Sequence, residues 1–157
     1  MTAIKFSAMP TVDAMPLWAG GADAYGMRPE TRISDGDGVP CRHCLGDVAA
    51  GEPFLILAYR PFDAAQPYAE TGPIFLHAKS CARHEEGDEV PGSFLKRGSY
   101  LLKGYCNKDR IVYGTGKHVA PADMAAYARE LFENPDIAYI HARSSLNNCY
   151  SCRIDRG

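Results

Sequence analysis

The chain has no long hydrophobic run, and this absence argues against a membrane-spanning helix. Its longest apolar run, Phe54 to Tyr59, is far shorter than the roughly 18 residues of a membrane helix. The first residues, Met1 to Phe6, lack the apolar stretch of a secretory signal peptide. We therefore expect a cytoplasmic protein with no membrane partner.

The sequence also has no surplus of positive charge. It holds 17 Lys and Arg against 19 Asp and Glu, a formal net charge of -2, and no segment concentrates basic side chains. Binding to a nucleic-acid backbone requires such a concentration. We therefore expect no nucleic-acid partner, and the sequence identifies no other partner.

A length of 157 residues suits one domain, which we predict over residues 1–157. Chains of this size bury about 68–70% of their unfolded-state surface, so a core can form without metal or disulfides. We predict an α+β fold with a mixed, mostly antiparallel sheet. Residues 11–40 are dense in Gly and Pro, which interrupt helices and central strands. We expect them to form an irregular segment that wraps the sheet edge, with one short strand near Arg32.

One helix is predicted at about residues 121–133, packed on the sheet. Apolar side chains such as Met124 and Leu131 recur there at helical spacing, between Pro121 and Pro135. The buried run Phe54 to Tyr59 predicts a central strand. A further strand is expected at residues 110–117, as the second half of a hairpin.

Cysteines at matched spacing are the main chemical signal. Cys41 and Cys44 are three positions apart, and so are Cys149 and Cys152. Two ligands at this spacing can hold one tetrahedral metal ion or form a redox dithiol. In a reducing cytosol such cysteines are more naturally ligands, redox groups or free thiols than structural disulfides. Our leading hypothesis is a binding or structural module whose four cysteines lie together and can hold zinc.

Alternative ligands and a metal-free interpretation stay open. Residues 149 and 152 of an extended strand point to opposite faces, so both reach one ion only across a turn or bulge. His77 at the end of a predicted strand, with Cys81 and His84 in the following loop, could supply the missing ligands. Without metal, the cysteines would be small buried hydrophobes and the histidines solvated.

A thiol oxidoreductase that uses Cys41 and Cys44 is one enzymatic alternative. Arg42 and His43, between the two cysteines, would lower a thiol pKa if they stayed near the sulfurs. The preceding segment, however, predicts a turn rather than the strand that leads into a thioredoxin-like site.

An enzyme that acts on an anionic small molecule is the other alternative. His141 and Arg143 share one face of a predicted strand, and Arg153 lies on the last predicted strand. Together they could hold a carboxylate or phosphate. On a half-solvated face, the same arginine stems would only cover apolar surface. The sequence does not decide whether the protein is an enzyme.

Several sequence blocks in a fixed order carry a family resemblance. They are Cys41 to Leu45, Gly51 to Phe62, Pro67 to His77, Arg110 to Gly116 and Asn147 to Ile154. Together they resemble the bacterial domain-of-unknown-function family 1203. The resemblance implies a small, stand-alone bacterial cytoplasmic protein, and it implies no particular activity.

Overall fold

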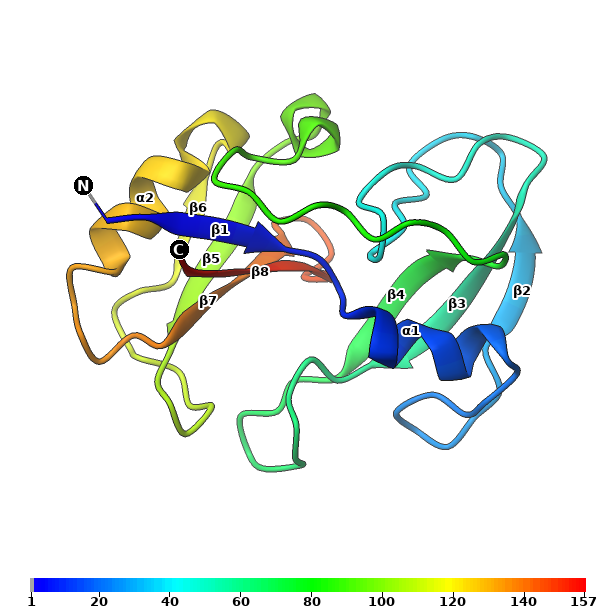
Figure 1. Ribbon diagram of the computed structural model, residues 1–157, viewed down its shortest axis with the longest axis horizontal. Helices are drawn as coiled ribbons and strands as arrows, with labels where there is room; N and C mark the ends of the chain where they lie inside the picture. The colour runs from blue at the N-terminus through cyan, green and yellow to red at the C-terminus, as the bar shows by residue number, and fades with distance from the viewer. Residues whose placement is uncertain (1) are drawn as a thin grey trace. The chain divides into compact units, whose positions relative to one another are not determined.

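The computed structural model describes residues 2–157, which form two α-helices and eight β-strands in two antiparallel sheets (Figure 1). The α+β class and the antiparallel character predicted from the sequence are therefore confirmed. Neither of the helices within residues 2–157 has the length and apolar character that crossing a bilayer requires.

Backbone contacts divide the chain into two compact units. The five-stranded unit contains residues up to Ser7, Gln66–Tyr68 and Glu85–Gly157, and the three-stranded unit contains Ala8–Ala65 and Ala69–His84. The expectation of a single domain over residues 1–157 stays a prediction.

The sheet of the five-stranded unit has the order β1-β8-β7-β5-β6, with all neighbours antiparallel. Its strands are β1 (Ile4–Ser7), β5 (Tyr100–Tyr105), β6 (Lys117–Val119), β7 (Tyr139–Ser144) and β8 (Tyr150–Arg156). Fully buried side chains of this unit include Phe6, Leu102, Ile140 and Ile154. They form the hydrophobic core along the sheet.

The predicted main helix lies in this unit. A 3-10 turn, η2 (Pro121–Asp123), leads into α2 (Met124–Leu131), and a second 3-10 turn, η1 (Gly92–Lys96), precedes β5. The buried stripe of α2, which includes Met124 and Leu131, packs against β5 and β1. The apolar spacing in the sequence therefore located the helix correctly.

The strand expected at residues 110–117 is wrong over most of its length. Only Ile111 pairs with β5, through a single bridge to Tyr105, and β6 begins at Lys117. Gly114 has a φ of 88°, and the Thr115 hydroxyl donates to the Val112 carbonyl and accepts from the Gly104 amide. This turn breaks the strand because its backbone leaves the extended region.

The three-stranded unit carries the sheet β2-β3-β4, also antiparallel. Its strands are β2 (Glu30–Ile33), β3 (Pro53–Tyr59) and β4 (Gly72–His77), and its helix is α1 (Thr11–Trp18). β3 is central, as its continuous apolar run predicted. β4 ends at His77, which places this side chain at one edge of the unit's sheet.

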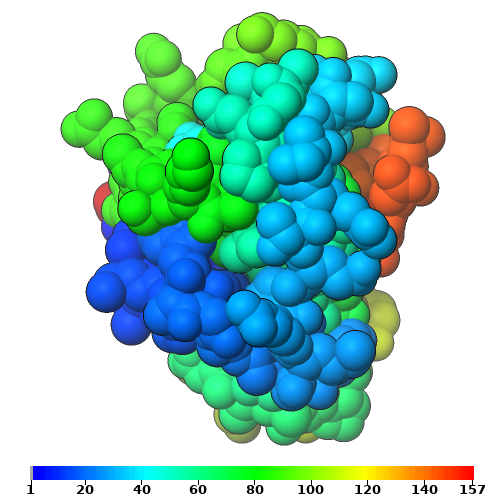
Figure 2. All heavy atoms as spheres, turned by 90° about the vertical axis from the view of Figure 1, so that its right-hand side faces the viewer, coloured from blue at the N-terminus to red at the C-terminus, as the bar shows by residue number. Residues whose placement is uncertain are grey.

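The short strand expected near Arg32 is present as β2, but the expectation that the rest of residues 11–40 is irregular needs correction because this range contains α1. Pro16 lies inside α1, and a proline at that place is normally read as a helix breaker. The helix is only eight residues long, and it buries Ala14 and Leu17. Residues 19–29 and 34–38 are mostly exposed loop, and Figure 2 shows this part of the chain in light blue on the surface.

Candidate metal centre

Three cysteines and one histidine of the three-stranded unit converge. Cys41, Cys44, His77 and Cys81 each offer one ligand atom, and all four atoms lie within 4.8 Å of one another. The Cys41 and Cys81 sulfurs are 3.8 Å apart, and the Cys44 sulfur is 3.6 Å from His77 Nδ1. A tetrahedral zinc site has edges of roughly 3.8 Å between sulfurs and roughly 3.5 Å between sulfur and nitrogen. These two distances match tetrahedron edges, and the remaining ones stay within 4.8 Å.

A tight turn presents the first two sulfurs. The Cys41 amide donates to the Gly46 carbonyl over 2.8 Å, and the Leu45 amide donates to the Cys41 carbonyl over 2.9 Å. Leu45 adopts a φ of 58°, and the Gly46 amide points at the Cys44 sulfur over 3.4 Å. Amide donors of this kind favour the thiolate form. The turn thus brings the Cys41 and Cys44 sulfurs to one side, as their spacing predicted.

Strand β4 and the loop after it bring the other two ligands to this turn. The Arg42 amide donates to the Phe75 carbonyl of β4 over 3.0 Å, which fastens the turn to the strand. The His77 amide then lies 3.4 Å from the Cys41 sulfur. Cys81 follows four residues later in the loop. Two segments that are far apart in the sequence therefore build one site.

His43 contacts the cluster and links it to helix α1. It is 1% exposed, its Nδ1 lies 3.3 Å from the Cys81 sulfur, and its Nε2 lies 2.8 Å from the Thr11 hydroxyl of α1. The tautomer with the proton on Nδ1 would donate to the sulfur and accept from Thr11. Groups that orient metal ligands in this way tune the affinity of the site. Burial, the largest cause, lowers the pKa of His43, which keeps the ring neutral.

Trp18 of helix α1 and Glu52, the residue before β3, lie next to His77 of the cluster. The Trp18 indole N–H donates to the His77 carbonyl over 2.9 Å, and the Trp18 ring meets the His43 ring edge-on at 5.0 Å between centroids. On the other side of the imidazole, His77 Nε2 lies 3.9 Å from a Glu52 carboxylate oxygen. This distance is longer than a hydrogen bond, so Glu52 contributes a nearby negative charge while His77 Nδ1 faces the Cys44 sulfur.

The sulfurs share negative charge unevenly. A hydrogen bond from Cys44, with further bonds from backbone amides, lowers the pKa of Cys41 to about 4 against the opposing effect of burial. The hydrogen bond to Cys41 raises the pKa of Cys44 well above its usual range. Burial and the neighbouring Cys41 charge raise the pKa of Cys81 to about 11. The charge on Cys41 thus opposes ionisation of the other two thiols. A divalent cation would remove this opposition, because it stabilises all three thiolates together.

The group contains only part of the ligand set that led the sequence analysis. It unites Cys41 and Cys44 with two of the alternative ligands, His77 and Cys81. The third alternative, His84, instead donates its backbone amide to the His43 carbonyl over 2.9 Å.

Cys149 and Cys152 belong to the five-stranded unit. Cys152 is fully buried in β8 opposite Ala142, and Cys149 precedes the strand with its sulfur 3.8 Å from the Asn147 carbonyl. The register of β7 and β8 shifts between these two cysteines. A bulge of this kind is what both sulfurs would need in order to bind the same metal ion. Metal binding by this pair stays a prediction.

His141, Arg143 and Arg153 also lie in the five-stranded unit. His141 is 0% exposed and faces Arg153 in the β7–β8 register. Burial, followed by the Arg143 and Arg153 charges, holds its pKa well below the ordinary value. Aromatic rings surround it at 4.8 to 5.1 Å between centroids, from Tyr105, Tyr139 and Tyr150. A neutral, enclosed imidazole of this kind packs as a core group.

The two arginines make contacts of their own. Arg143 is 4% exposed and donates to the Asn148 carbonyl over 3.2 Å. Arg153 lies 3.9 Å above the Tyr139 ring centroid and donates to Asp155 over 2.7 Å. These contacts favour a packing role, and anion binding by the three residues stays a prediction.

The supporting residues Thr11 and Trp18 were missed in the sequence. They reach the site only because α1 forms, and no spacing in the sequence signals that helix. A single tryptophan in the chain carries no motif that would assign it to a metal site.

Comparison with known proteins gives a family and no activity. Residues 38–156 match the family model described as "Protein of unknown function (DUF1203)". The match covers well over half of the chain and includes all four residues of the cluster. The chain matches no curated protein and no solved structure. The resemblance noted in the sequence is thus confirmed, and the chain belongs to the DUF1203 family of proteins of unknown function.

Proposed function

We propose that the protein is a zinc-binding module in which Cys41, Cys44, His77 and Cys81 hold one structural zinc ion. The observation that carries this proposal is the mutual distance of the four ligand atoms, all within 4.8 Å. One ligand pair comes from the turn at Cys41 and Cys44 and the other from the end of β4 and its loop. A zinc ion would therefore cross-link two segments of the three-stranded unit.

The ligand types point to zinc rather than to a harder cation. Three thiolates and one imidazole form a soft, nitrogen-and-sulfur set, which favours zinc over magnesium or calcium. Four protein ligands complete a tetrahedron, whereas catalytic zinc sites keep one position for water or substrate. The role supported best is thus structural.

Burial argues against the thiol oxidoreductase alternative. Cys41 has the lowered pKa that a reactive thiol needs, but it is 0% exposed. A redox thiolate must be reached by its partner or substrate, so reactive cysteines are at least partly exposed. An enclosed thiolate that accepts backbone amides suits a metal ligand better.

A cytoplasmic location is consistent with this proposal. All six cysteines are free thiols, and thiols persist in a reducing compartment.

Elemental analysis of the protein purified without chelators tests the proposal. We expect about one zinc per chain, because four protein ligands complete one tetrahedral site. Cys44→Ala should lose most of this zinc. Cys149→Ala is the matched control, because both cysteines are half-buried members of a pair with the same spacing.

Zinc far below one per chain in the wild-type protein would refute the proposal. Loss of zinc in Cys149→Ala with retention in Cys44→Ala would also refute it, and would favour a site built around the C-terminal pair.

A further inference from the structure

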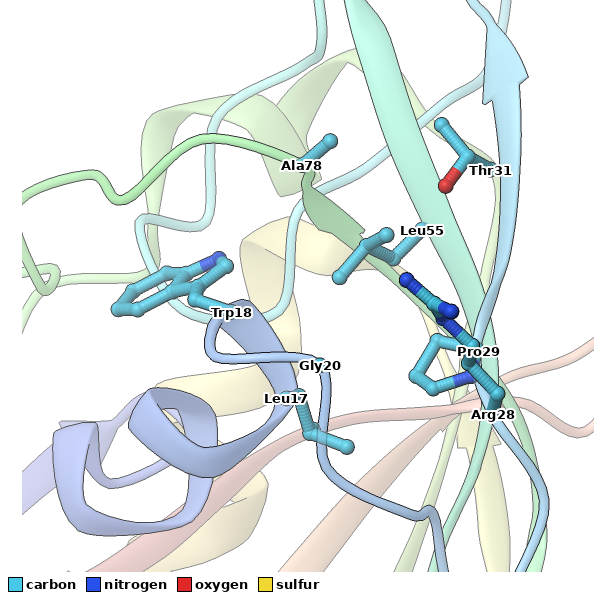
Figure 3. Close-up of a pocket in the computed structure, with 8 residues that line it drawn as sticks. All are labelled: Leu17, Trp18, Gly20, Arg28, Pro29, Thr31, Leu55 and Ala78. Atoms are coloured by element: carbon cyan, nitrogen blue, oxygen red, sulfur yellow. The ribbon is translucent and has the colours of Figure 1, made fainter.

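A cavity of about 190 Å³ lies in the three-stranded unit beside α1, β2 and β3 (Figure 3). Leu17, Trp18 and Leu55 give it an apolar surface, and two polar side chains, Arg28 and Thr31, also line it. Figure 3 shows the Trp18 ring on one side, the Arg28 guanidinium and Thr31 on the other, and Leu55 between them. The cavity therefore combines an apolar wall with a positive end.

The polar side chains of the cavity are available to a ligand. Within residues 2–157, neither the Arg28 guanidinium nor the Thr31 hydroxyl makes a side-chain hydrogen bond or ion pair. The neighbouring Arg32 differs, because it pairs with Glu30 over 3.3 Å.

The Asp23 carboxylate, five residues before Arg28, forms no ion pair with it within residues 2–157. It is occupied by the backbone amides of Tyr25, Met27 and Ala58, at 2.9 to 3.0 Å. Arg28 is exposed and has no carboxylate partner within residues 2–157, so its guanidinium can pair with an external anion.

We propose that this cavity binds a small carboxylate with a short apolar body. A guanidinium holds a carboxylate through two parallel N–H donors, and the Thr31 hydroxyl can add a third. The indole of Trp18 and the side chains of Leu17 and Leu55 would cover the apolar body and remove it from water. Pockets for drug-sized ligands span roughly 300–1,000 Å³, so this smaller cavity sets a limit on ligand size.

Titration with hexanoate tests this site, with fluorescence as the readout. Trp18 is the only tryptophan of the chain and lines the cavity, so its emission reports binding directly. We expect a saturable change for the wild-type protein. Arg28→Met should weaken hexanoate binding roughly tenfold or more, because it removes a charge-assisted hydrogen bond. Arg32→Met, which changes an exposed arginine that pairs with Glu30, should bind like the wild type.

Two further probes separate the parts of the ligand. 1-Hexanol has the same apolar body without charge, and inorganic phosphate has charge without the body. Both should bind at least roughly tenfold more weakly than hexanoate. Absence of saturation with hexanoate, equal affinity for 1-hexanol, or unchanged affinity in Arg28→Met would each overturn the proposal. None of the cavity residues named here is a proposed zinc ligand, but Trp18 donates to the His77 carbonyl. All titrations are therefore compared at one fixed zinc content.

Discussion

Cys81→Ala is expected to lower the melting temperature by about 10 °C in excess zinc. Binding to the folded state alone adds about 4 kcal/mol of stability when free ligand is about 1,000 times Kd, and each kcal/mol shifts the melting temperature of a chain this size by about 2–4 °C. Cys81 is the ligand of choice for this test because it lies in a loop and is half-buried. Its removal disturbs packing less than removal of the fully buried Cys41 would. Calorimetry or circular dichroism measures the shift.

The same measurement in excess chelator separates the metal from packing. Without zinc, the wild type and Cys81→Ala should melt close to each other, because the stabilising ligand is gone from both. Cys106→Ala changes another half-buried cysteine, in the five-stranded unit, and should leave the zinc-dependent shift intact. If Cys81→Ala destabilised the protein equally with and without chelator, Cys81 would act as a packing group and not as a ligand.

His43→Ala is expected to weaken zinc binding by about 10- to 100-fold, the usual cost of removing a group that orients a metal ligand. The variant loses the ring nitrogen that lies 3.3 Å from the Cys81 sulfur. It leaves all four proposed ligands in place, so zinc should still bind, only less tightly. Competition against a chromogenic zinc chelator measures the change.

Matched variants distinguish positioning from a general structural effect. His43→Asn keeps an N–H donor on a shorter side chain and should recover part of the affinity. His84→Ala removes a histidine that contributes only its backbone amide to His43, and it should bind zinc like the wild type. If His43→Ala left the zinc affinity unchanged, the ring would only fill space, and its contact with the Cys81 sulfur would not affect zinc binding.

Local features of the fold were predictable, while features that depend on distant pairing were not. The helix α2 follows from apolar residues at helical spacing and from Pro121 at its entry. The central strand β3 follows from its continuous apolar run. Helix α1 was missed because Pro16 indicates a helix break when only the neighbouring residues are considered. The helix is stabilised by the burial of Ala14 and Leu17 against the rest of the protein, which the local sequence does not reveal.

The candidate site divides in the same way. The turn at Cys41 and Cys44 is local, so the spacing of the two cysteines was enough to indicate that they lie together. The other two ligands depend on strand β4, whose Phe75 carbonyl receives the Arg42 amide. A contact between residues so far apart in the chain produces no recognisable spacing pattern in the sequence. Matched spacing therefore favoured Cys149 and Cys152, while His77 and Cys81 entered only as alternatives.

X-ray absorption at the zinc edge of the purified protein tests the central claim most directly, because it reports the number and type of ligand atoms. The proposed site predicts three sulfurs at about 2.3 Å and one nitrogen at about 2.0 Å from the metal. A shell of four sulfurs, as the two cysteine pairs together would give, or a shell of only nitrogen and oxygen would contradict it.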